Sequence, residues 1–236
     1  VMPERQIIVT GASRGIGAAI AMDLERRNYN VVGLSRGGQS VAGRGIACDV
    51  TDENAVRAVF ADIASAGSIV GLVNNAGLHL TAPSAELLTK DFEQVMTINT
   101  TSVMVSSREV YPYMKSAGAG CIINIGSFFD KMGVSSNLAY CASKAAVAAI
   151  TRCLSVEWAK DDIRVLNVAP GYIATDLNRD FLSKESVQAY LAKRIPSGKP
   201  GGAADVARMV GAIFDADIPF FTGETIYLDG GQGMNH

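Results

Sequence analysis

Hydrophobic and polar positions along the chain follow two alternating patterns. Short runs of apolar, often β-branched residues predict buried strands at 6–10, 30–35, 45–50, 69–77, 121–127, 163–171 and 224–231. Longer stretches, with apolar residues every three or four positions, predict helices at 16–28, 52–67, 91–118, 139–160 and 203–215. Because the strands are continuously apolar and alternate with helices, the pattern predicts a parallel sheet that is covered on both faces.

This alternation predicts an α/β fold, a single-domain Rossmann-like doubly wound parallel sheet with helices on both faces. The 236 residues suit one dinucleotide-binding and catalytic domain over 1–236. In such sheets, ligands bind beyond the carboxyl ends of the strands. The glycine-rich and polar segments follow predicted strands, as TGASRGIG (10–17), NNAG (74–77), GS (126–127) and APGYIATD (169–176).

Composition narrows the function classes. The net charge is -2 and no long basic run occurs, so nucleic acid and an anionic membrane are poor partners. No apolar stretch reaches the ~20 residues of a membrane-spanning helix, and a strand from Gln6 leaves no room for a secretory signal. The four cysteines show no C-x-x-C spacing, which favours a reduced, cytoplasmic setting. His79 and His236 are too few and too isolated for a metal site or a catalytic dyad.

A glycine turn joins the first predicted strand to the first predicted helix. Its spacing is G-x-x-x-G-x-G, and glycine permits positive φ and close approach of backbone to a phosphate. A helix that begins near Gly15 would direct free N–H groups and its positive dipole end at a pyrophosphate. The candidate residues are Gly11, Ser13, Arg14, Gly15, Ile16 and Gly17. The alternative is a tight strand-to-helix connection that binds nothing.

The motifs together resemble the short-chain dehydrogenase/reductase family. They are TGASRGIG (10–17), NNAG (74–77), IN (98–99), Ser127, YCASK (140–144) and PG (170–171), in the family's order and over nearly the whole chain. Ser127 also precedes Tyr140 by 13 residues, as is usual in that family. The resemblance implies a nicotinamide-dependent oxidoreductase whose catalytic set is Asn99, Ser127, Tyr140 and Lys144.

Physical chemistry gives each member of this set a task. A free phenol has a pKa of ~10, which is too high for a base near neutrality. Tyr140 and Lys144 share a helix face at i and i+4, so the ammonium is expected to lower the tyrosine pKa. As the resemblance implies, Tyr140 would then transfer a proton, Ser127 would orient the substrate oxygen, and Lys144 would also hold the nicotinamide ribose. The resemblance also implies that Asn99 would keep a water that links Lys144 to solvent. The alternative is a Tyr–Lys pair on a solvated helix face.

The resemblance also places cofactor contacts along the chain. Asn75, Ala76 and Gly77 are expected at the adenine ribose and nicotinamide side, and Asp49 and Val50 at the adenine. Pro170, Gly171, Ile173 and Thr175 are expected to cover the nicotinamide carboxamide. Tyr140 and Lys144 complete the set of cofactor contacts. The alternative is that Asn75 and Asp49 are turn residues without a ligand and that the segment from Pro170 is a structural loop.

The end of the second predicted strand indicates which cofactor is bound. NAD-preferring sites commonly carry an acid there, about 20 residues past the glycine turn. This chain has the neutral Ser35 instead, followed by Arg36, and Arg14 lies inside the glycine turn. A guanidinium makes paired, charge-assisted hydrogen bonds to phosphate. The sequence therefore predicts NADP(H), unless both arginines are only solvated turn residues.

The substrate is predicted to be a small, largely apolar carbonyl compound or secondary alcohol. The segment 175–200 suits a substrate lid, and the predicted contacts are Ser127, Phe128, Phe129, Tyr140 and Leu177. In wording, the motifs are nearest to 3-oxoacyl-[acyl carrier protein] reductases, which dock an acidic carrier on arginines before strands five and six. Here 115–121 keeps only a lysine, and Asp161 and Asp162 would repel the carrier, so a free small substrate ranks higher.

Three alternatives remain open from the sequence. The first is a 3-oxoacyl-[acyl carrier protein] reductase. The second is a nicotinamide-binding regulatory protein without turnover, and the third is a dehydratase or epimerase built on the same fold. The resemblance further implies a homotetramer that packs through its long helices.

Overall fold

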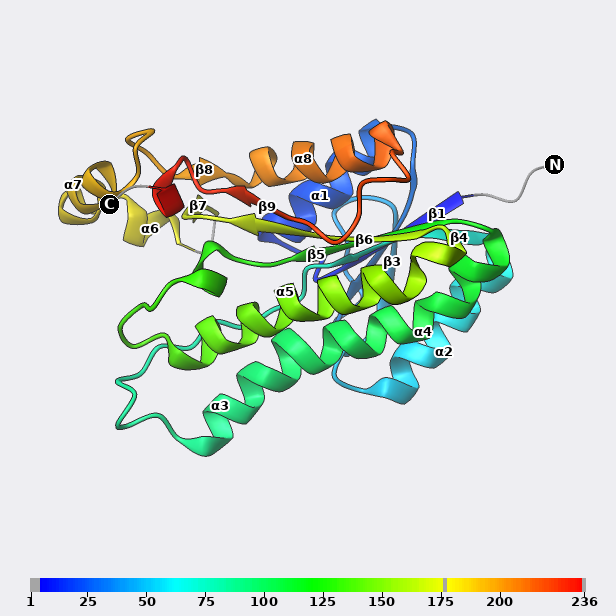
Figure 1. The fold of residues 1–236 in the computed structure, drawn as a ribbon, viewed down its shortest axis with the longest axis horizontal. Helices are drawn as coiled ribbons and strands as arrows, with labels where there is room; N and C mark the ends of the chain where they lie inside the picture. Colours follow the sequence, from blue (N-terminus) through cyan, green and yellow to red (C-terminus); the bar gives the residue numbers. More distant parts are fainter. Residues whose placement is uncertain (1–4, 176–177, 235–236) are drawn as a thin grey trace.

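The computed structural model describes residues 5–175 and 178–234, and over these residues the chain forms a seven-stranded parallel sheet with helices on both faces (Figure 1). The strand order is β3-β2-β1-β4-β5-β6-β9. Their bounds are β1 Arg5–Thr10, β2 Asn30–Ser35, β3 Arg44–Ala47, β4 Ser68–Asn74, β5 Gly120–Ile125, β6 Ile163–Pro170 and β9 Thr225–Leu228. The order reverses between β1 and β4, which confirms the predicted doubly wound sheet.

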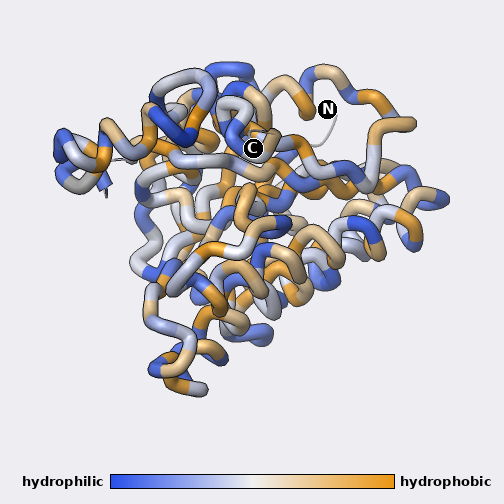
Figure 2. Tube along the Cα trace, turned by 60° about the vertical axis from the view of Figure 1, so that its left-hand side comes forward, coloured by the Kyte–Doolittle hydropathy of each residue, from blue (hydrophilic) through white to orange (hydrophobic). Residues whose placement is uncertain are grey.

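The helices divide between the two faces of the sheet (Figure 1). One face carries α1 (Gly15–Arg26) and α8 (Ala203–Ala216), and the other carries α2 (Glu53–Ala66), α4 (Ser102–Ala117) and α5 (Leu138–Trp158). Each face has its own core. Ile7 and Val9 of β1 are buried in one cluster and Ile8 between them in the other, because successive side chains in a strand point to opposite faces. Figure 2 shows the matching alternation of hydrophobic and hydrophilic residues along the helices.

The helix predicted over 91–118 is interrupted. It forms α3 (Thr89–Met96), a π-helical stretch η1 (Thr97–Thr101) and then α4. The wider turn alters the backbone hydrogen-bond ladder locally, and the hydroxyl of Ser102 donates to the carbonyl oxygen of Ile98 at 2.6 Å. The hydrophobic period hardly changes over five residues, so the sequence pattern did not reveal the interruption.

The predicted lid contains structure of its own. β7 (Ile173–Ala174) pairs with β8 (Gly201–Gly202) at its base. Between them lie α6 (Arg179–Leu182) and α7 (Glu185–Arg194), at one end of the molecule (Figure 1). Leu182, Leu191 and Ile195 form a small separate core there. Short 3₁₀ turns complete the described chain, as η2 Phe128–Lys131, η3 Ala159–Asp161 and η4 Gln232–Met234.

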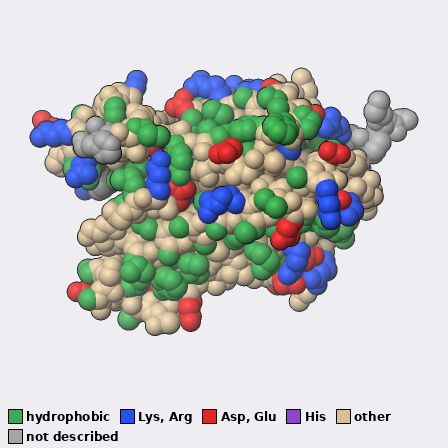
Figure 3. Space-filling view, in the orientation of Figure 1, with side chains coloured by type: hydrophobic (Ala, Val, Ile, Leu, Met, Phe, Trp, Pro, Cys, Tyr) green, Lys and Arg blue, Asp and Glu red, His purple; other side chains and the backbone are tan. Residues whose placement is uncertain are grey.

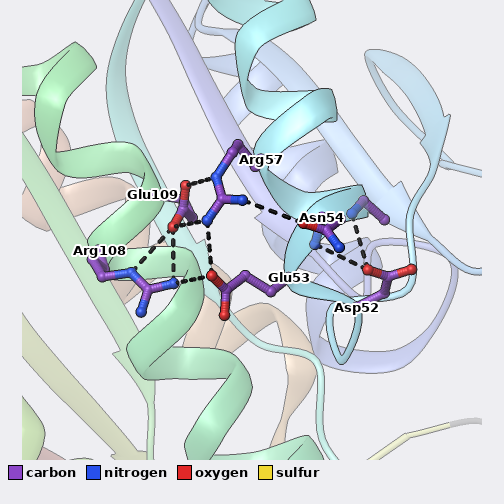
Figure 4. Close-up of polar contacts among 7 residues, drawn as sticks. Asp52, Glu53, Asn54, Arg57, Arg108 and Glu109 are labelled. Carbon is purple, nitrogen blue, oxygen red and sulfur yellow. Dashed lines mark hydrogen bonds and ion pairs between the residues drawn. The ribbon is translucent and has the colours of Figure 1, made fainter.

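Charged side chains of α2 and α4 form a network on the surface (Figure 4). Arg57 contacts Glu53 at 2.8 Å and Glu109 at 3.1 Å, and Arg108 contacts the same two carboxylates at 2.8 and 2.9 Å. On the molecular face drawn in Figure 3, acidic and basic side chains are interspersed. Among the described helices, none has both the length and the apolar character needed to cross a membrane.

Candidate active site

A cleft of about 890 Å³ lies beyond the carboxyl ends of the central strands. Nearly all predicted site residues line it, namely Gly11, Ser13, Arg14, Gly15, Ile16, Ser35, Arg36, Asp49, Val50, Asn75, Ala76, Gly77, Ser127, Phe128, Phe129, Tyr140, Lys144, Pro170, Gly171, Ile173 and Thr175. Gly17 and Asn99 do not lie on its wall, and Leu177 lies outside the described residues. Segments far apart in the sequence therefore meet in one cleft, as the strand order requires.

The glycine turn forms one end of this cleft. Gly11 and Gly15 have φ values of 69° and 59°, in the left-handed region that favours glycine. A Cβ at Gly17 would collide with the carbonyl oxygen of Gly11 and the amide of Asn75, so Gly17 permits close packing behind the wall. The first turn of α1 contains no acidic residue, and no side chain caps its N-terminus. Its N–H groups are therefore available to an anion.

The end of β2 has the expected neutral and cationic side chains. The hydroxyl of Ser35 donates to the carbonyl oxygen of Gln39 at 2.8 Å. Arg14 and Arg36 are exposed on the cleft wall, and neither guanidinium makes a hydrogen bond or ion pair with another residue of 5–175 or 178–234. Hydrogen bonds from Thr51 hold the pKa of Asp49 below its usual value, and Arg36 adds to this effect. Two unpaired cations thus line the cleft beside β2.

The NNAG segment is tied to the glycine turn. The Thr10 hydroxyl accepts from the N–H groups of Asn75 and Ala76 at 2.9 and 3.0 Å. The side-chain amide of Asn75 donates to the carbonyl oxygens of Thr10 and Gly11 at 2.9 and 3.2 Å. These bonds fix the carboxyl end of β4 against that of β1, so two walls of the cleft hold each other in place.

Lys144 is a buried cation that lacks an acidic partner among the described residues. It is 6% exposed, and its Nζ donates to the carbonyl oxygen of Ile125 at 2.7 Å. Burial lowers the pKa of Lys144 to about 8, because an apolar environment disfavours the charged form. Nζ lies 5.6 Å from the centre of the Tyr140 ring. The expected Tyr–Lys pair is therefore present, within one cleft and on one face of α5.

The expected lowering of the tyrosine pKa is not found. Burial raises the pKa of Tyr140 to about 12, and a hydrogen bond with Ser127 opposes this without reversing it. Desolvation of the phenolate is the largest cause, and the Lys144 ammonium, whose Nζ lies 5.6 Å from the ring centre, makes no hydrogen bond to the phenol oxygen that would offset it. The sequence expectation on this point was wrong for the protein alone. Tyr140 is consequently a protonated phenol, ready to donate.

Asn99 lies in η1, behind the cleft wall. Its Nδ2 donates to the carbonyl oxygen of Leu78 at 2.8 Å and to Oγ of Ser143 at 3.0 Å, and its Oδ1 accepts from the N–H of Leu78 at 2.7 Å. Asn99 thereby anchors the segment after NNAG to α5. Its expected contact with a water beside Lys144 stays a prediction.

Several wall residues were missed by sequence reasoning. His79 has its ring centroid 4.3 Å from that of Tyr140, and Tyr172 lies edge-on to Phe128 at 5.4 Å. Both follow recognised motifs within two residues, His79 after NNAG and Tyr172 after PG, and that proximity was the available signal. The other polar wall residues not anticipated are Thr51, Gln94, Thr97 and Asn178. The substrate end of the cleft is thus largely aromatic.

Comparison with known proteins finds a matching family model and similar reductases. A family model described as "Enoyl-(Acyl carrier protein) reductase" matches residues 11–233. The 3-oxoacyl-[acyl-carrier-protein] reductase MabA of Mycobacterium tuberculosis is 35% identical over 235 residues, covering 99% of this chain and 94% of that protein. The reductase FabG of Escherichia coli is 33% identical over 237 residues, covering 96% of both chains.

Solved structures with the same fold include sugar-acid dehydrogenases. A putative NAD(P) dependent gluconate 5-dehydrogenase from Beutenbergia cavernae, with bound NADP, superposes with a TM-score of 0.90 at 29% identity, over 100% of this chain and 98% of that one. A gluconate 5-dehydrogenase from Burkholderia cenocepacia, in complex with NADP and tartrate, gives 0.89 at 28% identity, over 100% and 97%.

Proposed function

The chain belongs to the short-chain dehydrogenase/reductase family, and we propose that it transfers hydride between NADP(H) and the carbonyl or secondary alcohol of a small, largely apolar substrate, with Tyr140 as the acid/base. It is an oxidoreductase that acts on CH–OH donors. One observation carries the proposal. Ser127, Tyr140 and Lys144 line the same cleft as the glycine turn.

The preference for NADP(H) rests on the groups at the end of β2. Ser35 carries no charge that would repel a 2′-phosphate, and the unpaired Arg14 and Arg36 lie on the same wall. The two gluconate 5-dehydrogenase structures bind NADP, which supports this preference. Side-by-side kcat and KM values with NADPH and NADH test it. We expect a higher kcat/KM with NADPH than with NADH, and we expect Ser35→Asp to shift this preference toward NADH. A higher kcat and lower KM with NADH for the unmodified protein would contradict the proposed preference.

The residues of this chain supply the proton chemistry. NADP(H), when bound, supplies the hydride and, once oxidised, a positive charge. With a pKa of about 12, the Tyr140 phenol is protonated and donates its proton to the carbonyl oxygen as the alcohol forms. The Lys144 ammonium, with a pKa of about 8, stabilises the resulting phenolate. Ser127 orients the substrate oxygen by a hydrogen bond. In the reverse direction the phenolate takes the proton from the alcohol.

The substrate end of the cleft supports a compact, mainly apolar substrate. Phe128, Phe129 and Tyr172 lie within 6.4 Å of one another, ring centre to ring centre, and Phe129 lies 5.9 Å from Tyr140 in an edge-on arrangement. Such rings bury apolar atoms of a bound molecule and leave Ser127 and Tyr140 to hold its oxygen.

A second candidate is 3-oxoacyl-[acyl carrier protein] reduction, which the similarity to MabA and FabG favours. The structure weakens part of the sequence argument against it. Asp161 pairs with Lys115 at 3.1 Å and accepts from the hydroxyl of Tyr111 at 2.8 Å, so its charge is compensated and Asp162 alone would repel an acidic carrier. The absence of arginines from 115–121 and 159–163 still ranks a free substrate first.

A substrate panel followed at the absorbance of reduced nicotinamide separates these candidates. It contains small ketones and one short 3-oxoacyl group, offered as a free thioester and attached to carrier protein. We expect kcat/KM to be no higher for the carrier-linked form. A gain of about 10² or more on the carrier would establish the second candidate instead. Tight NADPH binding without turnover of any substrate would favour a regulatory protein.

A further inference from the structure

His79 touches the proposed acid/base but has no part in the reaction described so far. It lies between β4 and α3, with an exposed side chain on the cleft wall. Its ring is tilted by 36° over the Tyr140 ring at 4.3 Å and lies edge-on to Phe129 at 6.4 Å. A polar ring therefore adjoins the position where substrate meets Tyr140.

Asn137 determines which nitrogen of His79 carries the proton. The Nδ2 group of Asn137 donates to the carbonyl oxygen of Ser135 at 2.8 Å, which leaves Oδ1 facing Nε2 of His79 within hydrogen-bond distance. A carboxamide oxygen only accepts, so Nε2 must be the N–H. Asn137 is nearly buried, at 9% exposed, and directly precedes α5, so the tether is held firmly. In the neutral ring, Nδ1 is then an acceptor with a free lone pair.

Nδ1 of His79 receives no hydrogen bond from any described residue. Among these residues, the imidazole ring makes one hydrogen bond, which runs from Nε2 to Asn137. We propose that Nδ1 of His79 accepts a hydrogen bond from a hydroxyl on the carbon next to the reacting carbonyl, so that the enzyme prefers α-hydroxy ketones and, in reverse, vicinal diols. The inference rests on the proposed function and sharpens its substrate class. The aromatic side chains of the cleft wall enclose the apolar part of a compact substrate, and His79 binds its α-hydroxyl group.

Three ketones of similar shape test the preference. They are 3-hydroxybutan-2-one, 3-methylbutan-2-one and 3-methoxybutan-2-one, which carry at one position a donor, an apolar group and an oxygen that only accepts. With saturating NADPH, we expect kcat/KM for the hydroxy ketone to exceed that for the methyl ketone about tenfold, the factor that one neutral hydrogen bond gives. The methoxy ketone should do no better than the methyl ketone. Equal rates for the methoxy and hydroxy ketones would overturn the inference.

Two variants separate recognition from packing. His79→Phe keeps a flat ring beside Tyr140 but has no nitrogen, so the ratio of kcat/KM for the hydroxy ketone to that for the methyl ketone should fall to about one. Tyr172→Phe is the matched control, because it removes the hydroxyl of another wall residue and should keep the preference. If the preference survived in His79→Phe, or disappeared in Tyr172→Phe instead, His79 would not be the group that reads the hydroxyl.

A second measurement does not depend on turnover. The chain has two histidines, so imidazole nitrogen resonances of the NADP⁺-loaded protein are few, and His79→Phe identifies the relevant ones. We expect the Nε2–H tautomer, and an Nδ1 resonance that moves with the hydroxy ketone but not with the methyl ketone. The opposite tautomer, or no response, overturns the inference even if ketones are reduced. A response without any reduction would refute the proposed hydride transfer and leave the recognition by His79 standing.

Discussion

Two groups of charged side chains on neighbouring helices differ in how their charges are compensated. On α2 and α4, Arg57 and Arg108 are about half exposed, and each contacts both Glu53 and Glu109 (Figure 4). On α5, Lys144 is buried, and among the described residues its Nζ donates one hydrogen bond, to the neutral carbonyl oxygen of Ile125. The first group satisfies its charges completely among its own members. The second leaves a positive charge available to a reacting neighbour.

This difference separates charges that neutralise one another at the surface from a charge that the proposed reaction would use. Exposed ion pairs contribute little to stability, because water and salt screen them. A buried ammonium without a counter-ion costs stability, and its pKa falls as a result. In the proposed mechanism, this cost is offset by the negative charge that forms beside Lys144 on the Tyr140 phenolate. The comparison therefore predicts opposite mutational profiles for the two regions.

Tyr140→Phe should give the largest effect. The ring and its contacts with Phe129 and His79 remain, but the transferable proton is gone, so turnover should fall by roughly 10²–10⁴ or more. NADPH affinity and Tm should change little. Rates with a ketone of the panel, NADPH titration and thermal melts measure the three quantities. Near-normal turnover would show that Tyr140 is not the proton donor and that the buried region is structural after all.

Lys144→Met should reduce turnover by a smaller factor, roughly 10², because it removes the charge that stabilises the phenolate. The lowered pKa of Lys144 also predicts how the unfolding free energy depends on pH. The pKa of Lys144 is about 8 in the folded protein and ~10.4 when unfolded. Between these values the unfolded chain binds more protons, so the unfolding free energy of the unmodified protein rises with pH relative to the variant.

Urea unfolding at pH 7 and pH 9.5 measures this. The stability difference between the unmodified protein and Lys144→Met should move in favour of the unmodified protein at pH 9.5. Arg57→Met, which removes a paired cation, is the control and should show no change over the same interval. A pH-independent difference for Lys144→Met would mean that its ammonium is better compensated than the structure indicates.

Features that depend on local sequence could be predicted, whereas features that depend on contacts between distant segments could not. The bounds of β2 were predicted without error, because a strand buried on both faces gives an uninterrupted apolar run. The edge strand β3 ends at Ala47, earlier than the predicted residue 50, because it pairs on one side only and is largely exposed. Most residues of the glycine turn, and Tyr140 and Lys144 of the YCASK motif, line the cleft as predicted, because short motifs specify local geometry.

What the sequence missed depends on contacts between distant segments. The high pKa of Tyr140 follows from burial, which no motif encodes. The stacking of His79 on Tyr140 arises where the segment after β4 meets the start of α5, 61 positions along the chain. Its tautomer depends in turn on Asn137 and Ser135. The π-helical stretch that contains Asn99 likewise changes the hydrogen-bond pattern without changing the hydrophobic period.

The smallest effect is expected at the surface network. Arg57→Met and Glu109→Gln, made singly and together, form a double-mutant cycle across α2 and α4. Although burial raises the pKa of Glu109, hydrogen bonds from Arg57 and Arg108 outweigh it and keep the carboxylate ionised. The coupling should therefore be favourable but small at low salt, and most of it should be lost in 1 M NaCl, because Arg57 is 52% exposed and salt can screen the pair from that side, although Glu109 is only 13% exposed. Turnover should stay unchanged in all three variants. A coupling that persisted in high salt, or a loss of turnover, would mean that this network supports the cleft, and the separation between stabilising charges and reactive charges would no longer hold.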